Sequence, residues 1–316
     1  MYTVKLTFNF DWPIFRQTPR NFGIWDDYQF IIDPNLSECD FWVIYSEYKL
    51  IEERCKCNKE NIFFLPAECY NTSARYPAKF LEQFGKIITV QKEIQGKNVI
   101  HHQNANPWFI EKNYDELVEL KPFRKTKLMS IVSSDKAFTE GHRKRLDFAK
   151  KIKEYFGDSV DLFGRGLNPF EKKWDTLADY KYHIAIENDS CDDWVTEKFF
   201  DPILAYSYPF YYGCPNIHKY ISEKSFTRID INNFNQSIEI IESIIGNDSI
   251  YNDFIDNSKI YRDVLLNEQQ LFPMLCSFLK QNAHLVDRKK INIISGLEKY
   301  EAKQNYLERL LGKIKF

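Results

Sequence analysis

Residues 180–213, YKYHIAIENDSCDDWVTEKFFDPILAYSYPFYYG, determine the fold that this sequence predicts. An apolar strand ends at Ile186, a polar loop follows, a charged helix starts near Glu197, and a second apolar strand covers 210–212. In α/β folds this arrangement holds phosphorylated ligands, because helix amides and the positive end of the helix dipole face the anion. Lys198 adds a full positive charge within the first turn. The segment therefore predicts a site for a phosphorylated ligand.

The composition describes a globular protein of ordinary kind. A chain of 316 residues is long for one hydrophobic core, so two domains are expected. The net charge of −2 gives no sign of a nucleic-acid partner. Seven cysteines without a repeated spacing do not make a disulfide framework, so we expect reduced thiols and a cytoplasmic location. No stretch reaches the length of a membrane span, and the N-terminus resembles a short strand more than a signal sequence.

Short apolar segments alternate with helical patterns along the chain, which favours parallel sheets. Strands are predicted in the first half at 4–8, 29–32, 41–45, 61–65, 87–90 and 98–100. A charged, proline-containing segment, 114–127, is interpreted as a linker. Strands of a second sheet are predicted at 128–132, 160–163, 184–186 and 210–212. Residues 143–156 place apolar side chains at helical spacing and predict a helix.

The opening segment resembles the signature of the family 10 glycosyltransferases, the α-1,3/1,4-fucosyltransferases. That signature reads approximately Tyr-Lys-Phe-x-Leu-Ala-Phe-Glu-Asn, then Asp-Tyr-Val-Thr-Glu-Lys-Phe. The matching positions here are Tyr180, Lys181, Tyr182, Ala185, Glu187, Asn188, Asp193, Val195, Thr196, Glu197, Lys198 and Phe199. The segment 214–234 resembles the family's downstream sequence, so the resemblance covers roughly 128–235. A long ordered match of this kind is more specific than a lone glycine motif.

The resemblance implies the GT-B fold, in which two Rossmann-like, doubly wound α/β domains face each other across a cleft. We expect an acceptor-binding domain at 1–125, a donor-binding domain at 126–270 and a C-terminal helical segment at 271–316. The implied reaction is inverting transfer of L-fucose from GDP-β-L-fucose to an oligosaccharide hydroxyl. It needs one base and no covalent intermediate. No cofactor is required, although a divalent metal ion would be compatible as a stimulator of the reaction.

Two cations are the candidates for binding the donor diphosphate. Lys198 lies in the first turn of the predicted helix. Arg145 shares the apolar helix face of Phe148 and Ile152, where a guanidinium is costly unless it binds an anion. By resemblance, this arginine contacts the donor diphosphate. A structural salt bridge of Arg145 is the alternative.

Other residues of the signature are assigned to the donor by resemblance. Glu197 suits the hydroxyls of the ribose or of the transferred sugar, and Thr196 belongs to the same motif. Glu187 and Asn188 end a strand, where they contact donor hydroxyls unless Glu187 pairs with Lys198. The family usually has tyrosine where this chain has Trp194, which donates a hydrogen bond but cannot accept one. This departure leaves room for a different sugar nucleotide.

The first half offers candidates for the acceptor side. Glu68 follows the predicted strand 61–65 and resembles the family's proposed base. His101 and His102 are the rivals for the base and are otherwise assigned to acceptor binding. Trp108 is assigned to stacking on an acceptor sugar, with core packing as the alternative.

Three further alternatives stay open. Glu187 and Asp189 could hold a divalent cation in a GT-A transferase, because oxygen ligands at this spacing bridge a metal to a diphosphate. A catalytically silent protein that binds a sugar nucleotide or a glycan is the second. The third concerns residues 288–316, which hold eight basic and three acidic residues. They either pack as a solvated helix or contact an anionic membrane surface.

Overall fold

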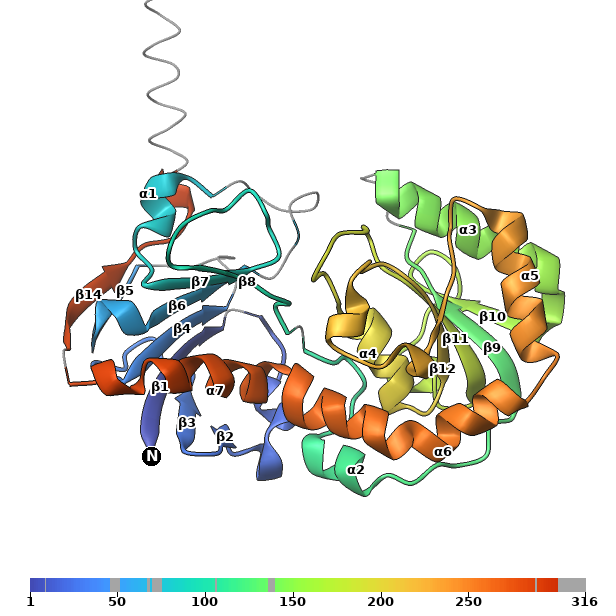
Figure 1. Ribbon diagram of the computed structural model, residues 1–316, viewed down its shortest axis with the longest axis horizontal. Helices are drawn as coiled ribbons and strands as arrows, with labels where there is room; N and C mark the ends of the chain where they lie inside the picture. Colours follow the sequence, from blue (N-terminus) through green and yellow to red (C-terminus); the bar gives the residue numbers. More distant parts are fainter. Residues whose placement is uncertain are drawn as a thin grey trace, which may run out of the picture. The chain divides into compact units, whose positions relative to one another are not determined.

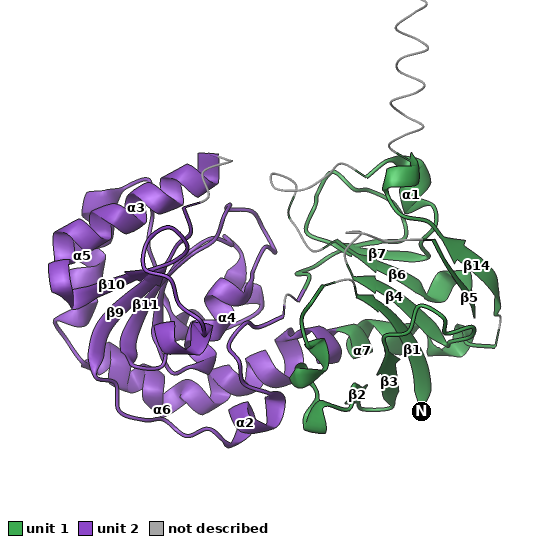
Figure 2. Cartoon of the chain, turned by 180° about the vertical axis from the view of Figure 1, so that it is seen from behind, with its two compact units in different colours: residues 1–104, 275–316 green, residues 105–274 purple. Residues whose placement is uncertain are grey.

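The computed structural model describes residues 1–8, 10–45, 52–66, 69, 76–105, 107–135, 140–287 and 289–300. The chain forms two compact units, which are coloured separately in Figure 2. The first unit comprises Met1–Asn104 and Leu275–Phe316, and the second comprises Ala105–Met274. Residues 105–125 therefore cluster with the second unit, and the C-terminal segment returns to the first.

The first unit is built on a seven-stranded sheet with the strand order β2-β3-β1-β4-β6-β7-β8. All neighbouring strands run parallel except β2 and β3. The bounds are β1 Tyr2–Phe8, β2 Ile24–Trp25, β3 Tyr28–Ile31, β4 Phe41–Tyr45, β6 Ile62–Leu65, β7 Lys86–Thr89 and β8 Val99–His101. Strands β4 and β6 are buried along their whole length, as expected of parallel strands that are covered on both faces. The six strands predicted in this half are confirmed to within two residues at each end.

A small antiparallel pair joins the two ends of the first unit's sequence. β5 (Glu53–Cys57) pairs with β14 (Lys290–Ile294). The sequence predicts a helical C-terminal segment, and α7 (Leu271–Gln281) is a helix. The prediction is wrong for Lys290–Ile294, where three β-branched isoleucines favour a strand and β5 supplies the hydrogen-bond partner. Residues 288 and 301–316 of the basic tail lie outside the described residues.

The second unit is built on a five-stranded parallel sheet with the order β10-β9-β11-β12-β13 (Figure 1). Its strands are β9 Lys127–Val132, β10 Val160–Phe163, β11 Tyr180–Ile186, β12 Tyr208–Tyr212 and β13 Thr227–Arg228. Its main helices are α3 Glu140–Phe156, α4 Glu197–Leu204, α5 Phe234–Ile245 and α6 Ser249–Val264. Helices α3 and α5 lie side by side on one face of this sheet, and α4 lies on the other. Helices on both faces of a parallel sheet make a doubly wound fold.

The strand order locates the place where a ligand is expected. In sequence order the strands read second, first, third, fourth and fifth across the sheet. The chain leaves β9 toward β10 and leaves the adjacent strand β11 in the opposite direction, toward β12. Ligands of open α/β sheets bind at the carboxyl ends of such a pair, called the topological switch point. Here Ser133 and Ser134 follow β9, and Glu187 and Asn188 follow β11.

The segment interpreted as a linker starts with a helix of its own. Helix α2 (Tyr114–Glu119) begins with a capping box, in which Asn113 accepts from the backbone of Glu116 and the Glu116 side chain accepts in return. Between α2 and β9 the chain forms no further helix or strand.

None of the seven cysteines forms a disulfide, and every one is buried except Cys191, which is partly exposed. Among the described residues, no helix combines the length and apolar character needed to cross a membrane.

Candidate functional site

Helix α4 points its N-terminus at the switch point because it follows directly on the loop after β11. Its N-cap is Thr196, whose hydroxyl accepts from the backbone N–H of Lys198 at 3.2 Å. The helix is short. Pro202 lies inside it and the helix ends at Leu204, in agreement with the disruption that proline causes.

Two cations meet the carbonyl end of the same helix. Lys125 donates to the carbonyl oxygens of Ala205 at 2.7 Å and Ala178 at 2.6 Å. The guanidinium of Arg262 donates to the carbonyl oxygen of Leu204. Burial lowers the pKa of Lys125 to about 7 and that of Arg262 to about 10. The guanidinium of Arg262 complements the negative end of the α4 dipole, and Lys125 satisfies a carbonyl oxygen at the same end.

Glu187 fastens the loop after β11 to the start of α4. Its carboxylate accepts from the backbone N–H of Thr196 at 2.9 Å and from the Thr196 hydroxyl at 2.8 and 2.9 Å. The Nζ of Lys198 lies 3.6 Å away, and the Glu187 side chain has no exposed area. Burial raises the pKa of Glu187, while Lys198 opposes this shift. Of the two roles considered for Glu187, the geometry favours the pairing with Lys198.

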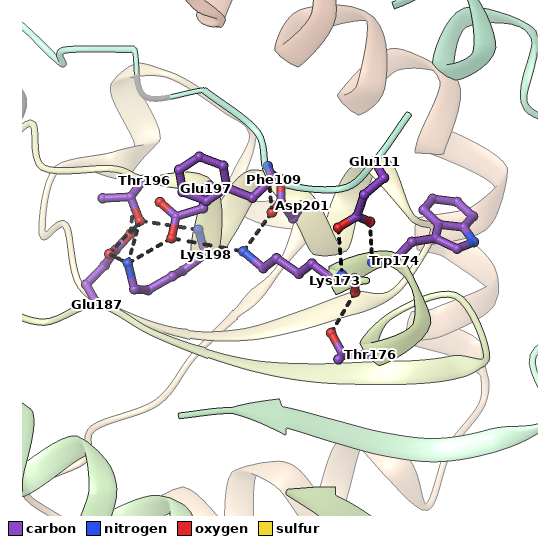
Figure 3. Close-up of polar contacts among 10 residues, drawn as sticks. All are labelled: Phe109, Glu111, Lys173, Trp174, Thr176, Glu187, Thr196, Glu197, Lys198 and Asp201. Atoms are coloured by element: carbon purple, nitrogen blue, oxygen red, sulfur yellow. Dashed lines mark hydrogen bonds and ion pairs between the residues drawn. The ribbon is translucent and has the colours of Figure 1, made fainter. Parts of the chain in front are cut away.

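Glu197 and Lys198 are neighbours at the start of α4 and form an ion pair (Figure 3). Lys198 Nζ lies 3.0 Å from Glu197, and their side chains are 24% and 14% exposed, the lysine being the more exposed. Burial would raise the pKa of Glu197, but the charges of Lys198 and Lys173 lower it to about 2. A ligand at the N-terminus of α4 therefore meets one ammonium group and one ionised carboxylate.

Arg145 reaches the switch point from α3. As predicted, it shares the buried helix face of Phe148 and Ile152, and it is 5% exposed. Its guanidinium donates to Oδ1 of Asn188 and, at 3.3 Å, to the hydroxyl of Ser134. Its buried Nε has no hydrogen-bond partner among the described residues. Arg145 thus bridges the ends of β9 and β11 with donor capacity to spare.

Trp194 lies in the loop that precedes α4. It is 2% exposed, and its indole Nε1 is buried without a hydrogen-bond acceptor in the described part of the chain. The preceding residue, Asp193, has a left-handed backbone with φ of 65°. Its carboxylate accepts from Asn216 at 2.9 Å and from the hydroxyl of Tyr220 at 2.6 Å, which fixes this strained turn.

Of the three candidates for the base, the structure describes His101 and His102. Glu68 lies outside the described residues. His101 is exposed at the end of β8, and its Nε2 lies 3.1 Å from the carbonyl oxygen of Ile94. His102 is half-buried and packs edge-on against Phe278.

Trp108 does not offer a surface to a sugar. It is 1% exposed in the core of the second unit, and its indole N–H donates to the carbonyl oxygen of Lys112 at 2.9 Å. A ring packed on both sides cannot stack on a ligand, so the alternative of core packing holds.

The GT-A alternative requires Glu187 and Asp189 as metal ligands. The oxygens of Glu187 are already engaged by Thr196 and Lys198. No group of three or more metal-ligating side chains occurs within the described ranges. The donor set at this position therefore does not fit a divalent cation.

Lys173 and Asp201 join the site although no sequence motif selects them. Lys173 lies in the 3₁₀ turn Lys173–Thr176, and its Nζ is 2.7 Å from Asp201 and 4.0 Å from Glu197. Asp201 follows Glu197 by four residues, which places both on one helix face. That spacing is the signal in the sequence that could have identified Asp201.

Comparison with known proteins identifies the family of this chain. The family model described as glycosyltransferase family 10 (fucosyltransferase), C-terminal part, matches residues 122–299. The α-(1,3)-fucosyltransferase B of Drosophila melanogaster is 31% identical over 98 residues, which cover 30% of this chain and 22% of that protein. The GDP-fucose protein O-fucosyltransferase 3 of Danio rerio is 47% identical over 47 residues, 15% of this chain and 10% of that protein. The matches thus span less than a quarter of these relatives.

A solved structure extends the similarity over most of the fold. The crystal structure of an α1,3-fucosyltransferase with GDP aligns with a TM-score of 0.52 at 14% identity, covering 89% of each chain. This similarity and the two parallel sheets confirm the predicted GT-B class with two Rossmann-like domains. Because the family model covers more than half of the sequence, the chain belongs to glycosyltransferase family 10, the fucosyltransferase family.

Proposed function

We propose that this chain is an inverting α-1,3/1,4-type fucosyltransferase that moves L-fucose from GDP-β-L-fucose to an oligosaccharide hydroxyl. One observation carries the proposal. Arg145 presents a buried Nε without a partner among the described residues at the switch point, where Lys198 lies in the first turn of α4. Two cations and a helix N-terminus suit a nucleoside diphosphate. The matched relatives and the aligned structure name fucosyl transfer, GDP-fucose and GDP.

The reaction is a single displacement. A base takes the proton of the acceptor hydroxyl while its oxygen bonds to the anomeric carbon of fucose. The bond from that carbon to the β-phosphate oxygen breaks on the opposite face, so the β-linked donor gives an α-linked product. GDP leaves with the electron pair of the broken bond. Arg145 and Lys198 stabilise the negative charge that develops on the β-phosphate, and stabilisation of developing charge is usually the main source of rate enhancement in an enzyme.

Arg145 and Lys198 stabilise the negative charge of the diphosphate, as a metal ion does in other transferases. We propose that no cofactor is required. Divalent ions would stimulate turnover only by helping GDP to leave.

The base is proposed to be Glu68, with His101 and His102 as rivals. A carboxylate or a near-neutral imidazole can accept a hydroxyl proton at physiological pH. The first unit supplies all three residues, in agreement with the family pattern of an N-terminal acceptor domain. A cytoplasmic location completes the proposal. Because Lys290–Ile294 pairs with β5 as strand β14, peripheral membrane contact is proposed only for the rest of the basic tail.

Trp194 supports a second candidate, a transferase of the same family that uses another sugar nucleotide. The buried indole replaces the phenol that the family signature has at this position. An indole fills more volume and offers only a donor. The nucleotide or sugar that fits beside it can differ accordingly.

Isothermal titration with GDP-fucose, GDP-mannose and UDP-glucose tests the donor, and transfer of radiolabelled sugar to an oligosaccharide panel tests the reaction. We expect GDP-fucose to bind most tightly and to be consumed. A preference for a UDP-sugar would support the second candidate. Tight GDP-fucose binding without transfer to any acceptor would instead indicate a sugar-nucleotide-binding protein.

A further inference from the structure

Lys173 lies between two carboxylates that differ in accessibility (Figure 3). Its Nζ is 2.7 Å from Asp201 and 4.0 Å from Glu197. Asp201 has no exposed side-chain area, whereas Glu197 retains 14%. Of the two carboxylates, a ligand can therefore reach only Glu197.

The backbone around Lys173 is fixed on both sides. The Glu111 carboxylate accepts from the N–H of Lys173 at 2.9 Å and from that of Trp174 at 3.1 Å. The Thr176 hydroxyl donates to the carbonyl oxygen of Lys173 at 2.7 Å. The Lys173 side chain is 12% exposed, and its ammonium group lies between the carboxylates of Asp201 and Glu197.

Asp201 serves as the buried end of this arrangement. Both of its carboxylate oxygens accept from the backbone N–H of Phe109 at 3.2 Å. Burial raises the pKa of Asp201 to about 6, although Lys173 opposes this shift. Asp201 therefore anchors Lys173 and contributes no surface to a ligand.

We propose that Lys173 is a positioning residue that holds the Glu197 carboxylate in place as the hydrogen-bond acceptor for a hydroxyl of the sugar nucleotide. This inference rests on the proposed function, because it requires a donor at the N-terminus of α4. Glu197 itself contacts that donor, and Lys173 acts through Glu197.

A second cation, Lys173, is needed because the first, Lys198, also interacts with the bound diphosphate. Lys198 is the more exposed ammonium group, and it would form an ion pair with a bound diphosphate. The added negative charge of the diphosphate would favour protonation of Glu197, and a protonated carboxyl loses acceptor capacity. Lys173 is half as exposed as Lys198 and is paired with Asp201 at 2.7 Å, so its charge remains beside Glu197 when Lys198 binds the diphosphate.

Five charged groups surround Glu197 and must be counted in any pH experiment. Lys198 and Lys173 favour its ionised form. Glu187 and Asp201 oppose it, since each carboxylate interacts with Glu197 electrostatically. Arg145 favours it from α3. Burial raises the pKa of two of these carboxylates, Glu187 and Asp201, the latter to about 6.

The test compares Asp201→Asn with the double variant Lys173→Met/Asp201→Asn. Asparagine keeps the shape of Asp201 and removes its titration, and the double variant leaves no buried charge unpaired, so both should fold. GDP-fucose is titrated at pH 7.5 and pH 5.0, where its diphosphate does not change charge. Circular dichroism at both pH values verifies folding.

We expect the wild type and Asp201→Asn to bind GDP-fucose with less than about twofold change between the two pH values. The double variant should bind about three- to tenfold more weakly at pH 5.0 than at pH 7.5. Lys173→Arg should restore the wild-type pH profile. Equal pH profiles for Asp201→Asn and the double variant would overturn the positioning role of Lys173 and leave the proposed function standing. Failure of the wild type to bind GDP-fucose would overturn the proposed function together with it.

Discussion

Arg145 and Asn188 meet across the topological switch point of the second unit, where the guanidinium donates to the amide oxygen that follows β11. The contact joins a helix that follows β9 to the strand next to β9. It also orients the guanidinium while its Nε stays without a partner among the described residues. A buried cation with unused donors is costly, and an anionic ligand would remove that cost.

Replacing Arg145 or Lys198 by alanine should each weaken GDP binding by about 1.5–3 kcal/mol, the value of a hydrogen bond to a charged group. Arg143→Ala is the matched control, because Arg143 lies exposed on the same helix. Isothermal titration with GDP measures all three. Unchanged affinity of both site variants would place the diphosphate elsewhere.

Transfer should continue in excess EDTA, because two side-chain cations and a helix N-terminus face the diphosphate. The measurement is the initial rate of fucose transfer before and after chelation, followed by addition of Mg²⁺ or Mn²⁺. A modest stimulation by either ion agrees with faster nucleotide release. Complete loss that Mn²⁺ alone restores would contradict the assignment.

Glu68→Gln should lower the transfer rate by about 10²–10⁴-fold and leave donor affinity nearly unchanged, since glutamine keeps the size of the side chain but cannot accept the proton. His101→Ala and His102→Ala should affect acceptor KM more than kcat. Steady-state kinetics with both substrates varied separate these outcomes. Near-normal turnover of Glu68→Gln beside an inactive histidine variant would move the base to that histidine.

Lys125→Met should change how stability depends on pH. Burial lowers the pKa of Lys125 to about 7, below its ordinary value of 10.5. Between these two values the unfolded chain binds a proton that the native protein does not, so stability rises with pH in this window. The wild type should therefore gain stability relative to Lys125→Met from about pH 7 to pH 9.5.

The midpoints of urea denaturation at pH 6.5, 8 and 9.5 measure this difference. Lys127→Met is a suitable control, because Lys127 is exposed and nearby. A constant offset between wild type and Lys125→Met across the three pH values would show that Lys125 keeps its charge throughout.

The sequence predicted the sheets of both units because their strands are short apolar runs bounded by polar turns. It also placed Arg145 on the buried face of α3, since helical periodicity depends only on local spacing. Thr196, Glu197 and Lys198 lie together because they are consecutive at one helix start.

Other features depend on contacts between distant segments. β14 forms because Lys290–Ile294 pairs with β5, more than two hundred residues earlier, and no local sequence pattern predicts that pairing. Trp108 has the composition of a sugar-stacking residue, and only the fold reveals that it is enclosed. Lys173 resembles any surface lysine until its turn is placed beside α4.

The distribution of thiols gives the protein a convenient reporter. Of its seven cysteines, only Cys191 is partly exposed, and it lies five residues before Thr196 in the loop that precedes α4. A maleimide dye should therefore label native wild-type protein at one position without prior removal of other cysteines. Fluorescence from that position would follow nucleotide capture in real time, on the same molecule whose transfer rate is measured.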